Sequence, residues 1–397
     1  MTTSSKRALL PYQIVFGVTS AAIGGILAVL GELRDELGFT DVGIGLIVTV
    51  GFLASCVAQI TMAPLADRGF GRQMAVAGVL VSAAALVVMV FADHFTLWVL
   101  SRAALGFGGG LLLPGIRRAA TVLDPANAGE NLGRLIVGEI IGFTLGPVIA
   151  AVLVQIGGLR LPFAVTAIGL FIFVPFVARL PDDGGHRTNR VEHSFDLLLL
   201  RRMQGALILV FGYFLLLGAF EAVIPLMFKD RGGGVLETGI AFTVFGLPIA
   251  FVSTHAGRTA DRLGGAKVAM IGMSVAAAIN LSYGFIPGIW PMVAVMIVAG
   301  VADGYGFTAG QVAVSRAVPE RRQAGALGLM GAVEVLGAGT AALPAAALYG
   351  EFGARATWVA VASASLVCLG LGALRIRGTD PVTKALPEEP HPPAPTM

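Results

Sequence analysis

The stretch "PLADRGFGRQ", residues 64–73, places an aspartate and two arginines between two long apolar runs. A looser copy, "GRTADRLGGAK", recurs at residues 257–267, so that Asp67 and Asp261 stand 194 positions apart. Close to these clusters, "DVGIGLIVTVGF" at 41–52 aligns with "ETGIAFTVFGLP" at 237–248. Repetition over about half the chain predicts two copies of one structural unit, an arrangement typical of transporters.

The composition predicts a polytopic membrane protein. Hydrophobic residues make up 56% of the chain and charged residues only 13%, and the mean hydropathy is +0.84, far above the soluble range. Continuous apolar runs favour helices over a β-barrel. Cys56 and Cys368 fall inside such runs, and the five histidines lack zinc-site spacing. The sequence therefore predicts no disulfide, no metal site, no cofactor and no enzymatic activity.

Runs of about 20 apolar residues are long enough to cross a bilayer as helices. Twelve of them are bounded by charges, proline or glycine. They are 11–30, 42–63, 74–91, 95–116, 132–155, 162–178, 205–228, 239–256, 268–286, 291–315, 324–349 and 357–374. We therefore predict an all-α integral membrane protein with twelve transmembrane helices in two six-helix bundles.

The longest polar connection divides the predicted helices six and six. We predict an N-terminal bundle over 1–180, a cytoplasmic central loop over 181–204 and a C-terminal bundle over 205–375. The remaining residues, 376–397, include the proline-rich "LPEEPHPPAP" and are predicted to be a disordered cytoplasmic tail.

Lysine and arginine are concentrated on one side of the predicted membrane. On the other side fall only Arg34, Arg160, Lys229, Arg231 and Arg355. Because basic loops remain cytoplasmic, we predict a multi-pass protein of the cell inner (plasma) membrane with both termini in the cytoplasm. The isoelectric point near 9.1 follows from this topology, so no nucleic-acid partner is predicted.

The charged cluster between the second and third spans resembles the loop signature of the major facilitator superfamily. Asp67, Arg68, Gly71 and Arg72 match it, although the leading glycine of the signature is replaced. The resemblance implies a twelve-helix transporter in which this loop and its copy at Asp261 and Arg262 act as cytoplasmic gates. The alternative is a basic turn without a switching role.

The fourth span, "WVLSRAALGFGGG" at 98–110, resembles the same superfamily through its Arg102 and Gly106. In that family the arginine is implicated in proton coupling. An arginine inside an apolar span is costly and should face a cavity or a partner, unless it extends toward lipid headgroups.

The fifth span carries Gly133, Gly142, Gly146 and Pro147 within "GRLIVGEIIGFTLGPVIAA" at 133–151. This spacing resembles the antiporter signature of drug and proton exchangers, with Ala150-Ala151 in place of its closing glycine pair. The small residues permit close helix contact and Pro147 permits a kink, so ordinary packing is the alternative explanation.

Four acids stand inside predicted spans, where an acid is expensive without a function: Glu139, Glu221, Asp303 and Glu334. We predict that these acids and Arg102 couple transport to protons. Structural alternatives are that Glu221 lines an outer entrance or that Asp303 bonds a neighbouring helix. By contrast, Glu32, Asp35 and Glu36 are predicted to lie in a solvated outer loop, and the first helix has no acid at its middle.

Polar and aromatic side chains inside other spans are candidates for a substrate cavity, although each could equally serve packing: Gln59, Tyr213, Asn280, Tyr283, Tyr305 and Gln311. Together the patterns predict a proton-coupled antiporter that exports a small amphipathic compound by alternating access. Its partners would be the substrate, protons and the lipid bilayer, with no resident cofactor, and the chain is predicted to act as a monomer. The rivals are an uptake symporter or uniporter and a non-transporting receptor.

Overall fold

The computed structural model describes residues 3–123, 128–179, 194–319 and 322–376. Within these ranges, the side chains of 3–9, 63–64, 67, 118–123, 128–134, 136, 194–195 and 324 also lie outside the description. The predicted tail from 377 onward, most of the central loop, the Asp67 side chain and the surroundings of Gly133 therefore fall outside it.

Every regular element of the described residues is helical. The elements are α1 (Thr3–Leu37), α2 (Asp41–Leu65), the π-helical turn η1 (Ala66–Phe70), α3 (Gly71–Phe91), α4 (Phe95–Leu123), α5 (Ala128–Gly157), α6 (Leu161–Val177), the 3₁₀-helix η3 (Ser194–Leu199), α7 (Arg201–Asp230), α8 (Val235–Leu263), α9 (Gly265–Tyr283), α10 (Ile289–Ser315) and α11 (Gln323–Ile376).

A helix covers each of the apolar runs that the sequence predicts to span the membrane. Ten helical segments are long and apolar enough to cross a bilayer, and α6 is a shorter apolar helix. The last segment, within α11, runs for 52 residues and is broken at Gly353, where φ is 73°. A positive φ is open to glycine and strained for other residues, so this position separates two spans within one element.

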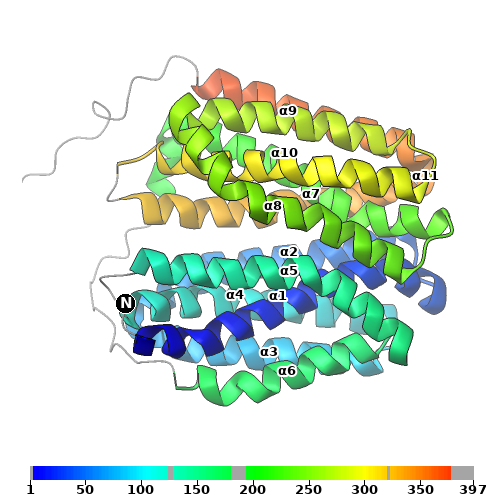
Figure 1. Cartoon of the computed structure of the whole chain (residues 1–397), viewed down its shortest axis with the longest axis horizontal. Coiled ribbons are helices and arrows are strands. Elements are labelled where there is room, and N and C mark those ends of the chain that lie inside the picture. The colour runs from blue at the N-terminus through cyan, green and yellow to red at the C-terminus, as the bar shows by residue number, and fades with distance from the viewer. Residues whose placement is uncertain (1–2, 124–127, 180–193, 320–321, 377–397) are drawn as a thin grey trace, which may run out of the picture.

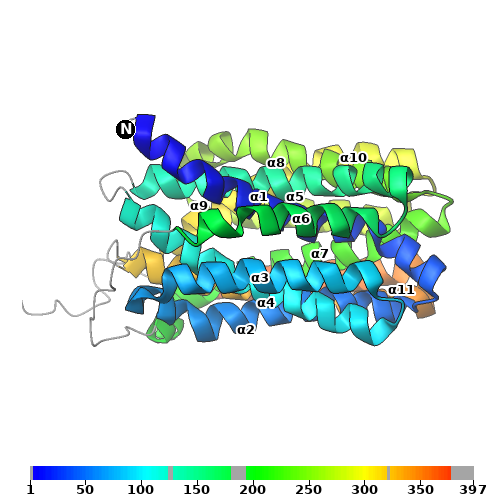
Figure 2. The same ribbon diagram turned by 90° about the horizontal axis from the view of Figure 1, so that it is seen from below.

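The helices form two bundles that lie one above the other in Figure 1, α1–α6 in one and α7–α11 in the other. Within the first bundle α1 packs on α5, and α4 packs on both α2 and α3; within the second, α7 packs on α11, and α10 packs on α8 and α9. Across the bundles α2 contacts α11 and α5 contacts α8. Figure 2 shows that the helices run roughly parallel to one long axis. We call the end where α1 begins the N-terminal end and the opposite end the far end.

The apolar core joins the two bundles chiefly toward the far end. One large buried cluster includes Leu27 and Ile44 of the first bundle and Phe220 and Phe242 of the second. Nearer the N-terminal end the clusters belong to single bundles; in α7, for example, Met203 belongs to a cluster confined to the second bundle. The bundles are therefore held together more extensively at the far end.

Several helix boundaries differ from the sequence predictions, and three of the differences concern predicted loops. The first helix continues past residue 30 to Leu37, so Glu32 and Asp35 lie on α1 rather than in a loop. Helix α7 begins at Arg201, inside the predicted central loop. The predicted loop at 64–73 is almost wholly helical, because Gly69, with φ of 92°, takes up the change of direction within η1.

Candidate functional site

The antiporter-like motif forms the contact between α5 and α1. A Cβ atom added at Gly142 would overlap the backbone carbonyl of Gly17, and one added at Gly146 would overlap Ala21. Four-residue spacing places both glycines on the same face of α5. Helix α1 can therefore lie directly against the α5 backbone, in a contact that larger side chains would prevent.

The same segment of α5 also contacts the second bundle. The hydroxyl of Thr243 on α8 donates to the Thr144 carbonyl at 2.9 Å, and Gly239 lies against the carbonyl of Pro147. A proline has no amide hydrogen, so Pro147 leaves one carbonyl in the preceding turn without its helical partner. The motif thus packs within one bundle and at the interface between the bundles.

A hydroxyl from α2 inserts into the hydrogen bonding of α11. Thr49 Oγ1 donates to the Gly339 carbonyl at 2.9 Å and accepts from the Leu343 amide at 3.1 Å. In a regular helix these two backbone groups would bond to each other, so Thr49 bridges an opened turn next to Pro344. The bundles are therefore joined by hydrogen bonds between α2 and α11 as well as between α5 and α8.

An ionic network closes the interface at the far end. Arg34 on α1 donates to Asp230 on α7 at 2.5 Å and to Asp41 on α2 at 3.2 Å. Lys229 lies 2.6 Å from Glu32, which gives a second ion pair between α1 and α7. The prediction that Glu32 and Asp35 belong to a solvated loop is wrong, because α1 extends far enough for this end to reach α7.

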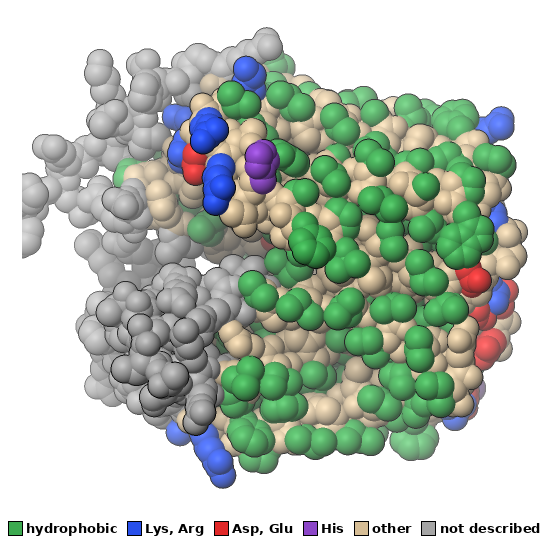
Figure 3. All heavy atoms as spheres, in the orientation of Figure 1, with side chains coloured by type: hydrophobic (Ala, Val, Ile, Leu, Met, Phe, Trp, Pro, Cys, Tyr) green, Lys and Arg blue, Asp and Glu red, His purple; other side chains and the backbone are tan. Residues whose placement is uncertain are grey.

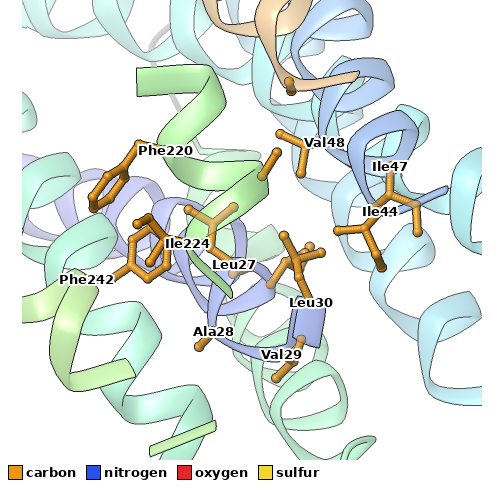
Figure 4. Packing of buried hydrophobic residues seen from close by; sticks show 14 of the residues in the cluster. Leu27, Ala28, Val29, Leu30, Ile44, Ile47, Val48, Phe220, Ile224 and Phe242 are labelled. Carbon is orange, nitrogen blue, oxygen red and sulfur yellow. The ribbon is translucent and has the colours of Figure 1, made fainter. Parts of the chain in front are cut away.

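Beneath the network, apolar side chains from four helices meet in a buried layer. Figure 4 shows Leu27 and Leu30 of α1 beside Val48 of α2, with Phe220 and Phe242 of α7 and α8 nearby. Leu27 and Leu30 are fully buried, and the Phe220 and Phe242 rings make an edge-to-face contact with centroids 5.3 Å apart. This layer and the ionic network together form the far-end gate.

Arg102 and Glu221 face each other across the interface within this closed region. Each residue is 2% exposed, and their opposite charges interact between α4 and α7. Gly51 on α2 makes room for the guanidinium, since a Cβ there would overlap it. Arg102 Nε and Glu221 Oε2 have no hydrogen-bond partner among the described residues. Arg102 is therefore buried with a partner rather than extended to headgroups, and Glu221 is enclosed rather than lining an entrance.

Glu139 and Glu334 approach each other from opposite bundles, closer to the N-terminal end. Their side chains are partly exposed, and the charge of Glu334 on α11 interacts with that of Glu139 on α5. Arg117, exposed near the end of α4, interacts electrostatically with both acids. Neither carboxyl has a hydrogen-bond or ion-pair partner among the described side chains. Two carboxyls from different bundles thus interact electrostatically while neither is paired with a side chain of its own bundle.

Asp303 lies away from that interface, inside the second bundle. It is 5% exposed and interacts with Tyr213 on α7 and Tyr283 on α9. Asp303 Oδ1 has no hydrogen-bond partner among the described residues. The structure therefore separates the four predicted acids into a cross-bundle pair, a buried partner of Arg102 and an acid within one bundle.

The two predicted gating loops occupy equivalent places at the N-terminal end. In the first, Arg68 is exposed and Gly71 packs against α4, whereas the Asp67 side chain lies outside the description. In the second, Asp261 accepts from Arg316, which follows the last residue of α10, at 2.7 Å, while Arg262 is exposed. The Asp261–Arg316 ion pair lies within the second bundle.

A further ion pair joins the residue before α11 to η3. Arg322 donates to Asp196 of η3 at 2.6 Å, and this hydrogen bond lowers the pKa of Asp196. Both residues belong to the second bundle, so the pair stabilises that bundle and not the interface.

The predicted cavity residues do not gather at one place. Gln59 is next to Gly331 of the opposite bundle and so lies at the interface near Glu334. Asn280 is buried and donates to the Ala276 carbonyl of its own helix at 2.9 Å. The Tyr305 ring contacts exposed His255 at a centroid distance of 6.0 Å. Gln311 is half-buried on α10.

Sequence comparison decides the family. The sequence pattern of the Major Facilitator Superfamily matches residues 13–232 and 205–397, which together cover nearly the whole chain. The chain belongs to the Major Facilitator Superfamily. It is a multi-pass membrane transport protein, as the loop signatures predicted.

Curated relatives of this superfamily member include the multidrug resistance protein MdtG of Salmonella choleraesuis (strain SC-B67). The two chains are 24% identical over 302 residues, which cover 72% of this chain and 75% of that protein. MdtG of Enterobacter lignolyticus (strain SCF1) is also 24% identical, over 314 residues that cover 75% of each chain.

A bacterial homolog of the human lysosomal transporter Spinster, solved in an inward-facing and unoccupied conformation, shares the fold of this superfamily member. Its TM-score is 0.81 at 14% identity, with 95% of this chain and 98% of that chain covered. A D-xylose-proton symporter also has the fold, with a TM-score of 0.72 at 16% identity and coverage of 92% and 95%. The fold is therefore shared with solved transporters of low sequence identity.

The far-end network is the part of the site that sequence reasoning missed. A signal was present, because Glu32 and Lys229 are 197 positions apart and Arg34 and Asp230 are 196 apart. These offsets nearly equal the repeat spacing, so the acids and bases lie at the ends of repeat-related helices. Opposite charges at such equivalent positions predict pairing between the bundles of this superfamily member.

Proposed function

We propose that this chain is a secondary active antiporter that exports a small amphipathic compound in exchange for protons. One observation carries the proposal: Glu139 and Glu334, contributed by different bundles, interact electrostatically on the N-terminal side of a closed far-end gate. A ligand between them would contact both bundles at once, so its binding would favour one relative placement of the bundles over another.

The orientation follows from the distribution of lysine and arginine. With the basic N-terminal end in the cytoplasm, the closed gate faces outward, and Glu139 and Glu334 lie on the cytoplasmic side of it. An exporter collects its substrate from that side. The multidrug resistance relatives and the antiporter-like α5 segment support export over uptake.

Alternating access requires the far-end gate to separate while the N-terminal end closes. Opening breaks the Arg34–Asp230 and Lys229–Glu32 pairs and parts the apolar layer below them. The substrate then leaves outward, and a proton entering from outside neutralises a carboxylate. When the bundles return, this proton passes to the cytoplasm, so one proton moves inward as substrate moves outward.

Several carboxyls are candidates for carrying the proton. Glu139 and Glu334 alternate between the two sides by virtue of their place at the interface. Glu221 is coupled to the bundle movement through its interaction with Arg102 of the other bundle. Asp303 would act from within the second bundle, through its contact with Tyr213.

Proton flux in liposomes that contain the purified full-length protein tests the proposal. A pH-sensitive dye is enclosed, and lipophilic cations, neutral drugs and sugars are added outside in turn. Antiport predicts that entry of a substrate drives protons out and makes the interior alkaline. Acidification on addition of a substrate would instead establish symport, and substrate entry without a pH change would establish uniport.

A further inference from the structure

The outer surface of α8 carries a stripe of exposed side chains near the N-terminal end. Phe251, His255, Arg258 and Arg262 are all exposed, and their spacings of four, three and four residues place them on one helix face. Lys267, also exposed, follows on the first turn of α9 after the bend at Gly264. Figure 3 shows lysine and arginine side chains gathered beside a histidine at this end of the upper bundle.

The charge of this stripe is not balanced by the protein. Between residues 251 and 267 the only acid is Asp261, and its carboxylate is paired with Arg316 at 2.7 Å. Arg258, Arg262 and Lys267 have no ion-pair partner among the described side chains. Like charges four residues apart on a helix destabilise it, so Arg258 and Arg262 favour an anion held between them.

The same face continues into an apolar side chain. Phe251 is 80% exposed, so it presents its phenyl ring to the surroundings of the bundle. Because the chain spans a membrane, those surroundings are acyl chains at the level of Phe251 and headgroups at the level of the arginines. An anion that carries an acyl chain would satisfy both parts of the stripe.

We propose that this stripe binds an anionic phospholipid, with the phosphate on Arg258, Arg262 and Lys267 and an acyl chain along Phe251. A soluble anion would gain nothing from the exposed phenyl ring. A basic loop that served topology alone would need its charges on the correct side of the membrane but not aligned on one helix face. The lipid bridges α8 and α9 across Gly264 and anchors the N-terminal end of the second bundle to its leaflet.

Binding of phosphatidylglycerol and phosphatidylcholine to the detergent-solubilised full chain, measured by native mass spectrometry, tests this site. We expect phosphatidylglycerol to bind more tightly. The Arg258→Gln/Arg262→Gln variant should lose about thirtyfold in apparent affinity for phosphatidylglycerol. Each arginine near the membrane surface contributes roughly fivefold to the binding of an anionic lipid. The matched control, Arg160→Gln/Arg355→Gln, removes two far-end arginines and should bind phosphatidylglycerol as the unaltered protein does.

Three results would overturn the proposal. One is equal binding of the two lipids, and another is an equal loss of binding in the far-end control variant. The third is displacement of phosphatidylglycerol by equimolar glycerol phosphate, which would assign the site to a soluble anion. If the double variant does not fold, the unaltered protein still decides the question: added salt must weaken phosphatidylglycerol binding and leave phosphatidylcholine binding unchanged.

Discussion

Replacing Arg34 with glutamine should loosen the far-end gate without unfolding the protein. Arg34 pairs with Asp35 and Asp41 inside its own bundle and with Asp230 in the other bundle. Pairs within one bundle persist whether the gate is closed or open, so they do not bias the movement. Only the 2.5 Å contact with Asp230 is lost when the bundles part at this end.

The size of the effect follows from how exposed that pair is. The Arg34 side chain is 16% exposed and the Asp230 side chain is 42% exposed, so water screens their attraction. A partly exposed pair contributes about 1 kcal/mol, which corresponds to roughly a fivefold change in an equilibrium constant. Adding Lys229→Gln, which removes the contact with Glu32, should bring the total to about 2 kcal/mol, or roughly thirtyfold.

Spin labels on the two bundles measure this shift directly. Glu36 on α1 and Glu351 on α11 are exposed, and cysteines at these positions carry the labels once Cys56 and Cys368 are replaced by alanine. Pulsed dipolar spectroscopy then gives the distribution of distances across the far end. Arg34→Gln should increase the long-distance population about fivefold relative to the short-distance one.

A second far-end arginine supplies the control. Arg160 pairs with Asp93 at 2.5 Å, but both residues belong to the first bundle, and both are more than half exposed. Arg160→Gln should therefore leave the distance distribution unchanged. An unchanged distribution in Arg34→Gln, or an equal change in both variants, would refute the assignment of Arg34 to the gate.

Two further substitutions test the packing and the buried charges, each by thermal unfolding of the purified protein. Arg102→Gln leaves the Glu221 carboxyl buried opposite a neutral group and should lower the free energy of unfolding by about 3 to 5 kcal/mol. The double variant that also carries Glu221→Gln should recover part of that loss. Additive losses would show that the two charges are independent. Gly142→Leu forces a side chain into the Gly17 carbonyl and should destabilise the protein by about 1 to 3 kcal/mol or more. The control Gly370→Leu, whose new side chain would meet open space, should not destabilise it. Equal melting temperatures of the two variants would contradict the close α1–α5 contact.

The architecture could be predicted from the sequence because the hydropathy of a segment and the placement of its glycines determine local structure without knowledge of the tertiary fold. Apolar runs of span length have to become helices in a bilayer, and the glycines at 142 and 146 permit close packing wherever that face points. Helix ends were harder to place. Residues 31–37 include four charges, which end an apolar run, yet α1 continues through them because α7 supplies the opposite charges.

The site could be predicted only as a set of unusual residues and not as an arrangement. An acid within a span is visible in the sequence, but the direction in which it points depends on the rotation of its helix. Glu139 and Glu334 point between the bundles, whereas Asp303 points into one of them. Asn280 and Tyr305 were equally plausible cavity residues, and neither lies with Glu139. The sequence left open whether Glu221 serves proton coupling or lines an entrance, because its partner, Arg102, is remote in sequence.

The most direct test of proton-coupled export compares Glu139→Gln with the exposed control Glu351→Gln in liposomes. Both substrate exchange at equal pH and substrate movement driven by a pH gradient are measured on the same preparations. The account predicts that Glu139→Gln retains exchange but loses gradient-driven movement, and that Glu351→Gln retains both. Full gradient-driven transport by a folded Glu139→Gln variant would contradict it.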